Sequence, residues 1–204
     1  MDTTARPTVA VFDFDGTMTR RDSTTAFCLA TVPARRLVPV LALRAPRLAA
    51  FRLGLASRTA VKESLLTALL GGMEDALLRR RAAAWARAAL PGLVRPAALA
   101  RLRWHQSRGH RVVLASASLE VLLEPWARSV AVSDVLATRL EVRSGRVTGR
   151  LDGPNCYGPE KVARLRALLG DLDAFEVFAY GDSRGDRELL AAARHPAYRP
   201  FHRA

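Results

Sequence analysis

The segment Val11-Phe12-Asp13-Phe14-Asp15-Gly16-Thr17 constrains this chain more than any other. The apolar run that leads into it predicts a buried β-strand over residues 8 to 14. Because side chains alternate along a strand, Asp13 and Asp15 should leave its end on the same side. Two carboxylates so close repel each other unless a cation lies between them or one is protonated. The pattern therefore predicts a metal site or an acid–base pair, and its plain alternative is two solvated acids.

The rest of the pattern indicates an α/β fold. Residues 22 to 90 have apolar residues at helical spacing and predict three or four helices packed as a small bundle, which Pro91-Gly92 closes. Further helices are expected near residues 96–108, 119–129, 159–169 and 187–193. Short strands are expected near residues 111–115, 135–142, 146–151 and 175–180. Strands that alternate with helices in this way predict a mostly parallel sheet with helices on both faces.

Polar residues stand where several of these predicted strands end. Ser116 follows the second strand, Lys161 opens a helix, and Asp182 and Asp186 follow the last predicted strand. Each has a plain reading, such as a surface charge, a turn residue or, for the neighbouring Ser118, a helix cap. In parallel sheets, however, ligands bind beyond the carboxyl ends of the strands, where these residues would meet.

Read as chemistry, these residues predict a phosphate site. Asp13 would be a carboxylate nucleophile, and Asp15 the general acid that protonates the leaving oxygen and later activates water. Mg²⁺ would bridge Asp13, Asp182 and the phosphate oxygens. Asp186 would hold a metal-bound water or orient Lys161. Ser116 would donate a hydrogen bond to the phosphoryl group, and Lys161 would supply a compact positive charge. Thr17 would orient Asp13 or contact the phosphate.

Four parts of the chain resemble, in order, the four motifs of the haloacid dehalogenase-like hydrolase superfamily. They are residues 13–17, Ser116, Lys161 and residues 181–186. The resemblance spans residues 8 to about 193, and the long helical insertion is similar to that of the phosphoserine-phosphatase-like branch (subfamily IB type). Ser116-Ala117-Ser118 and Asn155-Cys156-Tyr157-Gly158-Pro159-Glu160-Lys161 resemble a bacterial subgroup that includes a phosphatidylglycerophosphate phosphatase. The resemblance implies a Rossmann-like core formed by residues 1–18 and 93–204, and an inserted helical cap formed by residues 19–92. It also implies Mg²⁺-dependent hydrolysis of phosphomonoesters, with Asp15 offering the metal its backbone carbonyl.

The chain departs from that branch at two places. Gly185 stands where phosphoserine phosphatases usually carry Asn before the final motif Asp. No cap Arg lies in register with the one that grips the phosphoserine carboxylate, so Arg58 and Lys62 are the candidate substitutes for contacting substrate in the cap.

Composition leaves the partner open between a small molecule and an anionic surface. The formal net charge is +13, but with only two lysines, Lys62 and Lys161, the other 32 − 2 = 30 basic residues are Arg spread over most of the chain. This spread favours background composition over a polyanion site, and aromatic residues at 6% leave few stacking platforms for nucleic acid. Two distant cysteines and an N-terminus without an apolar signal segment predict a cytoplasmic protein. The four histidines show no ligand spacing.

Residues 37 to 56 are the most hydrophobic stretch, yet they contain Arg44, Arg47 and Arg52. We expect a buried bundle helix there, or else a basic interfacial helix in peripheral contact with an anionic membrane. The favoured function is a phosphomonoester hydrolase acting on a lipid or other anionic organic phosphate. The alternatives are a phosphomutase or phosphotransferase using the same aspartates, and a non-catalytic module that binds anionic membranes. Dehalogenation is disfavoured because it leaves Asp15 without a leaving oxygen to protonate.

Overall fold

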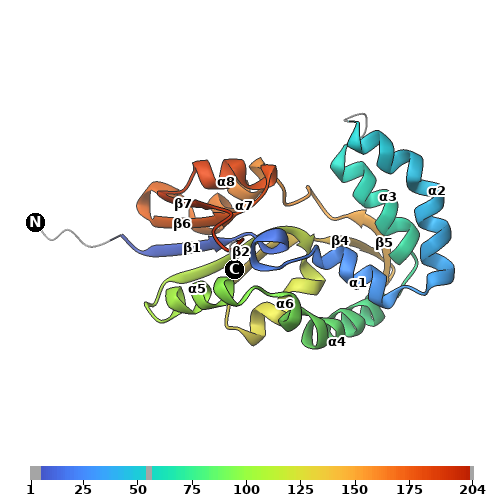
Figure 1. The fold of residues 1–204 in the computed structure, drawn as a ribbon, viewed down its shortest axis with the longest axis horizontal. Helices are drawn as coiled ribbons and strands as arrows, with labels where there is room; N and C mark the ends of the chain where they lie inside the picture. Colours follow the sequence, from blue (N-terminus) through green and yellow to red (C-terminus); the bar gives the residue numbers. More distant parts are fainter. Residues whose placement is uncertain (1–5, 54–56, 203–204) are drawn as a thin grey trace, which may run out of the picture.

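A five-stranded parallel sheet forms the centre of the protein in a computed structural model that describes residues 6–53 and 57–202 (Figure 1). The strands are β1 (Thr8–Phe12), β2 (Arg111–Leu119), β3 (Asp134–Thr138), β6 (Glu176–Gly181) and β7 (His195–Tyr198), in the order β3-β2-β1-β6-β7. All neighbouring pairs are parallel. The chain leaves β1 toward β2 on one side and returns on the other side at β6. The carboxyl ends of β1 and β6 therefore flank the switch point at which such sheets bind ligands.

Helices cover both faces of this sheet, as the sequence predicts. α5 (Pro96–Gln106) and α6 (Glu120–Ser129) lie on one face, and α7 (Pro159–Leu169) and α8 (Arg187–Ala191) lie on the other (Figure 1). Alternate residues of β1 point to opposite faces, so Phe12 packs in the core cluster that contains Leu102 and Leu122, whereas Val11 packs with Leu165 and Leu189. This double burial explains why the strands read as continuous apolar runs.

Four helices are inserted between β1 and β2: α1 (Ser23–Thr31), α2 (Ala34–Arg52), α3 (Arg58–Leu70) and α4 (Asp75–Leu93). The side chains of Asp22 and Ser57 cap the starts of α1 and α3 by accepting backbone N–H bonds. An antiparallel hairpin of β4 (Leu140–Arg143) and β5 (Arg146–Leu151) packs against α3, where the Leu151 N–H donates to Glu63 Oε1 at 2.9 Å. The hairpin thus extends from the sheet region to the inserted helices.

Several predicted element boundaries are wrong. β1 ends at Phe12, and Phe14–Met18 forms a tight turn in which Asp15 (φ −76°, ψ 120°) and Gly16 (φ +88°) have non-helical backbone angles. α4 continues through Pro91-Gly92, where the sequence predicts that the helical region closes, and ends at Leu93. α2 also contains two prolines, Pro39 and Pro46, inside the helix. Each proline removes one backbone hydrogen bond, and the exposed positions of Pro39 and Pro46 leave the freed carbonyls accessible to water. β2 extends to Leu119, and the strand expected over residues 135–142 is divided into β3 and β4.

Within the described residues, none of the helices combines the length and the apolar character that crossing a membrane requires.

Candidate active site

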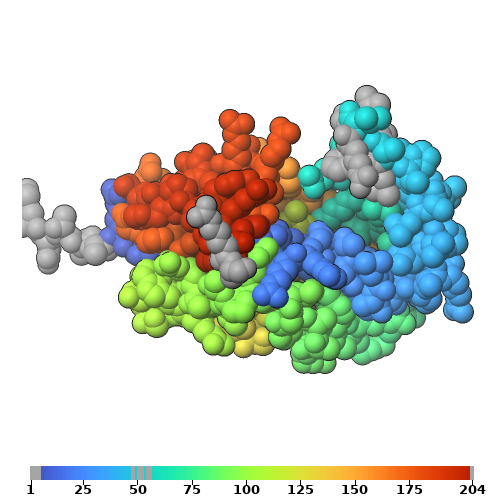
Figure 2. All heavy atoms as spheres, in the orientation of Figure 1, coloured from blue at the N-terminus to red at the C-terminus, as the bar shows by residue number. Residues whose placement is uncertain are grey.

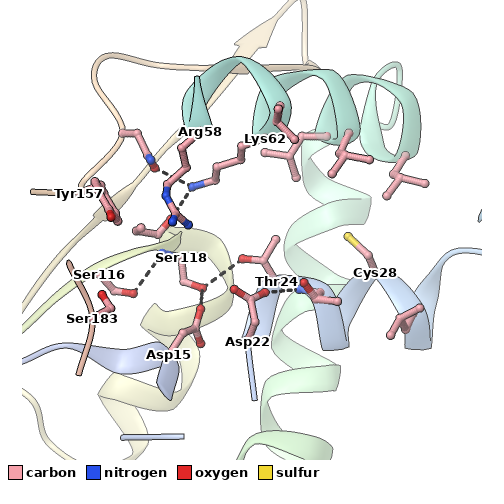
Figure 3. Close-up of a pocket in the computed structure, with 18 of the residues that line it drawn as sticks. Asp15, Asp22, Thr24, Cys28, Arg58, Lys62, Ser116, Ser118, Tyr157 and Ser183 are labelled. Atoms are coloured by element: carbon pink, nitrogen blue, oxygen red, sulfur yellow. Dashed lines mark hydrogen bonds between the residues drawn. The ribbon is translucent and has the colours of Figure 1, made fainter. Parts of the chain in front are cut away.

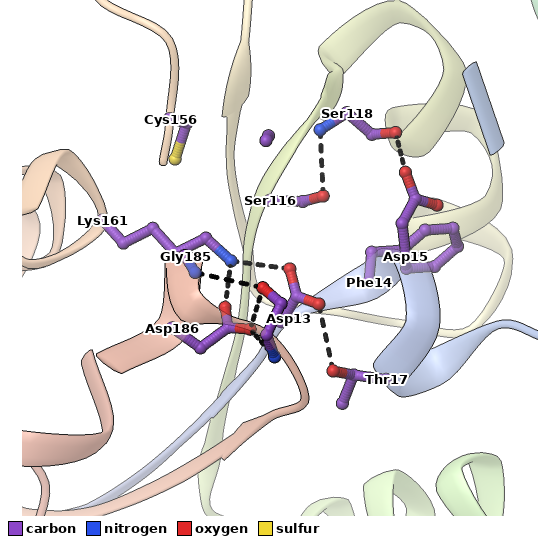
Figure 4. A network of polar contacts seen from close by, with 12 residues as sticks. Asp13, Phe14, Asp15, Thr17, Ser116, Ser118, Cys156, Lys161, Gly185 and Asp186 are labelled. Carbon is purple, nitrogen blue, oxygen red and sulfur yellow. Dashed lines mark hydrogen bonds and ion pairs between the residues drawn. The ribbon is translucent and has the colours of Figure 1, made fainter. Parts of the chain in front are cut away.

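Asp13 is the first residue after β1 and is held at the centre of a polar network (Figure 4). Its backbone N–H donates to the Tyr180 carbonyl at 2.9 Å, which continues the pairing with β6. Its Oδ1 accepts from Lys161 Nζ at 2.6 Å, and its Oδ2 accepts from Thr17 Oγ1 at 3.0 Å. The residue is only 5% exposed. Burial raises the pKa of Asp13 despite the opposing charge of Lys161, and Asp186 and Asp182 raise it further.

Lys161 lies in the first turn of α7 and bridges two carboxylates. Its Nζ donates to Asp13 Oδ1 and to Asp186 Oδ1, each at 2.6 Å. The preceding Gly158 adopts φ +62°, and its N–H bonds to the Gly185 carbonyl at 2.9 Å, which fixes the start of α7 beside the loop after β6. Burial alone would lower the pKa of Lys161, but the two carboxylates hold it above its usual range. The side chain therefore stays an ammonium.

Asp186 accepts a hydrogen bond from Lys161 and also stabilises the turn formed by residues 182–186. Its Oδ2 accepts from Ser183 N at 3.0 Å, Ser183 Oγ at 2.9 Å and Asp182 N at 3.1 Å. In return, Ser183 Oγ accepts from Gly185 N at 3.1 Å, which completes a capping box around the short helix Arg184–Asp186. Of the two roles open from the sequence, the geometry favours orienting Lys161, because both oxygens of Asp186 already have protein partners.

The donor set beside Asp13 suits a hard divalent cation. Carboxylate oxygens of Asp13, Asp182 and Asp186 lie within 4.8 Å of one another. Three carboxylates and one ammonium leave a net charge of −2, which a single Mg²⁺ would neutralise. A Cβ at Gly16 would lie 2.5 Å from Asp182 Oδ2, so only glycine lets this carboxylate reach its place. Thr17 Oγ1 joins the two sides, lying 3.0 Å from both Asp13 Oδ2 and Asp182 Oδ1.

Asp15 belongs to a second network, which the sequence did not predict (Figures 3 and 4). Asp15 lies in the tight turn after β1, and its side chain points toward the start of α1 and the end of β2. Its Oδ1 accepts from Ser23 N at 2.8 Å, and its Oδ2 accepts a short hydrogen bond from Ser118 Oγ. Burial, and then the charge of Asp22, raise the pKa of Asp15 to about 7. This is the range for a carboxyl that donates a proton near neutral pH.

A cavity of about 540 Å³ is lined by both Asp13 and Asp15, and Figure 3 shows Asp15 on its wall. Its floor is polar and includes Asp13, Asp15, Ser116, Ser118 and Lys161. Its roof comes from α1, α2 and α3 and is mostly apolar, with Cys28, Leu29, Leu37, Leu41, Val61, Leu65, Leu66 and Leu69.

Charged side chains from α3 descend from this roof toward the floor. Lys62 Nζ donates to the Ala117 carbonyl and to Asn155 Oδ1, the second at 2.8 Å. Burial lowers the pKa of Lys62 to about 8. The Arg58 guanidinium lies over the Tyr157 ring, 4.6 Å from its centroid. Both candidates from the sequence therefore line the cavity, although Lys62 is already bonded to the sheet region.

The family model described as haloacid dehalogenase-like hydrolase matches residues 10–191. The chain belongs to this family. It is 38% identical over 196 residues to Protein CicA of Caulobacter vibrioides, an alignment that covers 96% of this chain and 87% of CicA. The crystal structure of a protein of unknown function from Bordetella pertussis Tohama I superposes with a TM-score of 0.80 at 27% identity, covering 95% of this chain and 89% of that one. A structure titled a phospho-aspartyl intermediate analogue of phosphoserine phosphatase superposes with a TM-score of 0.60 at 18% identity, covering 92% and 84%.

Within this hydrolase fold, the predicted site residues fall into two groups. Asp13, Thr17, Lys161, Asp182 and Asp186 meet in one bonded network. Ser116 lines the same cavity, and its Oγ accepts from Ser118 N at 3.0 Å. Asp15 lines the same cavity as Asp13, but its hydrogen bonds belong to the second network, with Ser23 and Ser118.

Sequence reasoning missed the partners of Asp15. Ser118 does not cap α6 with its side chain and bonds Asp15 instead, while Ser23 Oγ lies 2.6 Å from Ser118 Oγ. The only signal was Ser-Ala-Ser at the end of an apolar strand. It also missed Asn155, whose Oδ1 accepts from both Lys62 Nζ and Thr138 Oγ1.

Proposed function

We propose that this protein is a Mg²⁺-dependent phosphomonoester hydrolase that works through a phospho-aspartyl intermediate on Asp13. The observation that carries the proposal is that two neighbouring aspartates, Asp13 and Asp15, have different surroundings. Asp13 is bonded to a lysine that stays charged, whereas Asp15 is buried among hydroxyl groups with a pKa of about 7. The pKa of Asp13 is raised only to about 6, so near neutral pH Asp13 is mostly ionised for attack whereas Asp15 is able to carry a proton.

In the first step, an oxygen of Asp13 attacks phosphorus and the bond to the leaving oxygen breaks. Asp15 donates its proton to that oxygen, so an alcohol leaves. In the second step, Asp15 takes a proton from water as the water attacks phosphorus, which releases inorganic phosphate and restores Asp13. Lys161 and the Ser116 hydroxyl lie on the floor of the cavity and would stabilise the charge on the phosphoryl oxygens.

Asp13 and Asp182, with the Asp15 backbone carbonyl, would hold Mg²⁺. When bound, this ion supplies positive charge to the phosphoryl oxygens and offsets the excess of carboxylates. Asp186 would serve as a positioning residue for Lys161, and Thr17 would orient Asp13.

The four inserted helices would act as a cap over residues 1–18 and 93–204 and would select the leaving group. Their apolar lining favours an organic phosphate with an apolar part, such as a lipid phosphate, and the cations Arg58 and Lys62 favour additional negative charge.

The test is release of inorganic phosphate by the purified chain, with Mg²⁺ or with a chelator, from lipid phosphates, phosphoamino acids, sugar phosphates and nucleotides. We expect Mg²⁺-dependent turnover that is fastest on a substrate with an apolar leaving group. Turnover confined to small polar phosphates would contradict the proposed substrate class.

The intermediate needs a separate experiment. Acid quenching during turnover of ³²P-labelled substrate should trap label on the protein, and hydroxylamine should release it, as expected for an acyl phosphate. Asp13→Asn should trap no label and lose about 10³-fold or more in kcat. Near-normal turnover by this variant would show that the nucleophile is another residue.

A further inference from the structure

The outer face of α2 is apolar and has no protein partner among the described residues. Val38, Pro39, Ala42, Leu43, Ala45 and Pro46 are all exposed, and together they occupy the side of the helix opposite Leu37, Val40 and Arg44. Val38 is 63% exposed and Leu43 is 78% exposed. In the described part of the chain, five of the seven large exposed hydrophobic residues lie between Leu29 and Leu53. Val38 and Leu43 among them belong to the outer face, whereas Leu29 and Leu41 line the cavity. Such clustering marks an interaction surface, whereas scattered apolar residues do not.

This face lies on a formed and anchored helix. Arg36 Nε donates to the Ala68 carbonyl at 3.0 Å, and Arg44 Nε donates to the Ser64 carbonyl and Oγ, each at 3.0 Å. These bonds fix the inner side of α2 to α3 and leave the outer side at the edge of the molecule, away from the sheet (Figures 1 and 2). The apolar residues on the outer side of α2 are therefore exposed to solvent because the other side of the helix is bonded to α3.

The charge around this face identifies its partner. Residues 23 to 62, which include α2, contain seven cations and no carboxylate. Arg58 and Lys62 line the cavity and Arg44 is bonded to α3, whereas Arg35 is exposed on the outer side of α2. A second copy of the chain would bring the same cations against each other, which disfavours self-association through this face. Nucleic acid would satisfy the charge but would leave the apolar residues in water. A surface that is both anionic and apolar satisfies both features.

We propose that the outer face of α2 docks on the surface of an anionic lipid bilayer, with Val38 and Leu43 inserted among the lipid chains and Arg35 against the headgroups. The docking goes beyond the proposed hydrolase activity. It would also bring the cavity close to the bilayer, because Leu37 and Leu41 of the same helix line that cavity.

The experiment is co-sedimentation of the full chain with phosphatidylcholine vesicles that contain or lack phosphatidylglycerol. We expect binding only to the anionic vesicles, and weaker binding when salt is raised. The test variant is Val38→Glu/Leu43→Glu, which should bind at least about tenfold more weakly. Its matched control is Val142→Glu/Tyr198→Glu, which adds the same charge at two exposed hydrophobic residues outside the inserted helices and should bind like the original chain.

Hydrolysis of a soluble substrate tests the folding and the catalytic activity of each variant independently of its binding to vesicles. All variants should hydrolyse a soluble aryl phosphate at the original rate, since Val38 and Leu43 do not line the cavity. If the glutamate variant unfolds, Val38→Ser/Leu43→Ser removes the apolar contacts without adding charge. Equal vesicle binding by the serine variant and the original chain would overturn the proposal, as would no binding of the original chain. A dimer in solution that only these substitutions dissociate would assign the face to a second copy instead.

Discussion

The ring of Tyr157 occupies the space that a side chain at position 185 would need, so Gly185 and Tyr157 fit together as a pair. Phosphoserine phosphatases usually carry Asn at this motif position. Here the loop after β6 instead packs against Tyr157, which lines the cavity and stacks with Arg58. The departure from the motif is therefore compensated locally, and Asp186 keeps its full set of hydrogen bonds.

Because Gly185 and Tyr157 are in contact, we expect substitutions at the two positions to have coupled effects on the free energy of unfolding. Gly185→Ala should displace the Tyr157 ring, lower the free energy of unfolding by about 1–3 kcal/mol and raise KM. In the double variant with Tyr157→Ala, the added methyl group has room, so the two stability losses should not add. Urea unfolding of both single variants and the double variant gives the coupling energy. Simple additivity would contradict the pairing.

Asp15→Asn should separate the two chemical steps. A nitrophenolate leaving group needs no proton, so the variant should still form the phospho-aspartyl intermediate from an aryl phosphate. Hydrolysis of the intermediate should be slow because the base is missing. Rapid-mixing measurements should then show a burst of about one nitrophenolate per protein, followed by turnover slowed by about 10²-fold or more. Asp13→Asn is the control without a burst, and a burst in that variant would exclude the proposed nucleophile.

Lys161→Met should destabilise the fold as well as stop turnover. It leaves the carboxylates of Asp13 and Asp186 buried without their partner, which typically costs about 3–5 kcal/mol. The planar guanidinium of Lys161→Arg should not restore activity. Arg79→Met is the matched control, because its salt bridge with Asp75 is solvent-exposed and should be worth about 1 kcal/mol or less. Equal losses in urea unfolding would contradict the assigned role of the buried bridge.

The buried His105 predicts how stability depends on pH. Its Nε2 lies 2.9 Å from the Tyr180 hydroxyl, and its Nδ1 lies 2.8 Å from His110 Nδ1, so protonating both imidazoles would place two N–H donors face to face. Burial, and then His110, lower the pKa of His105 to about 4. Below about pH 6.5 the unfolded chain binds a proton that the folded chain does not, so stability is complete above that pH and is lost as pH falls toward 4.

We expect this loss to contribute about 1–2 kcal/mol between pH 7.5 and pH 5, measured by urea unfolding. His105→Gln should be less stable at pH 7.5 but should lose less on acidification than the original chain. An identical loss in both proteins would assign the pH dependence to other groups.

The sequence by itself determined the α/β class, the parallel sheet and the identity of most residues on the cavity floor. It could do so because buried strands need continuous apolar runs, and because the carboxyl ends of parallel strands meet at one edge. Asp13, Ser116 and Asp182 could thus be placed together from their positions after predicted strands. Lys161 could be chosen because the chain otherwise uses arginine almost throughout.

Only the tertiary structure decided which partners these side chains contact. Strand periodicity predicts Asp13 and Asp15 on the same side, and both line one cavity, but it does not predict that Asp15 is bonded to Ser118 and Ser23. Ser118 lies 103 residues from Asp15 in the sequence, and Ala117 and Asn155 lie 55 and 93 residues from Lys62. Tyr157 lies 28 residues before Gly185. Such contacts depend on how whole elements pack, which local sequence patterns do not encode.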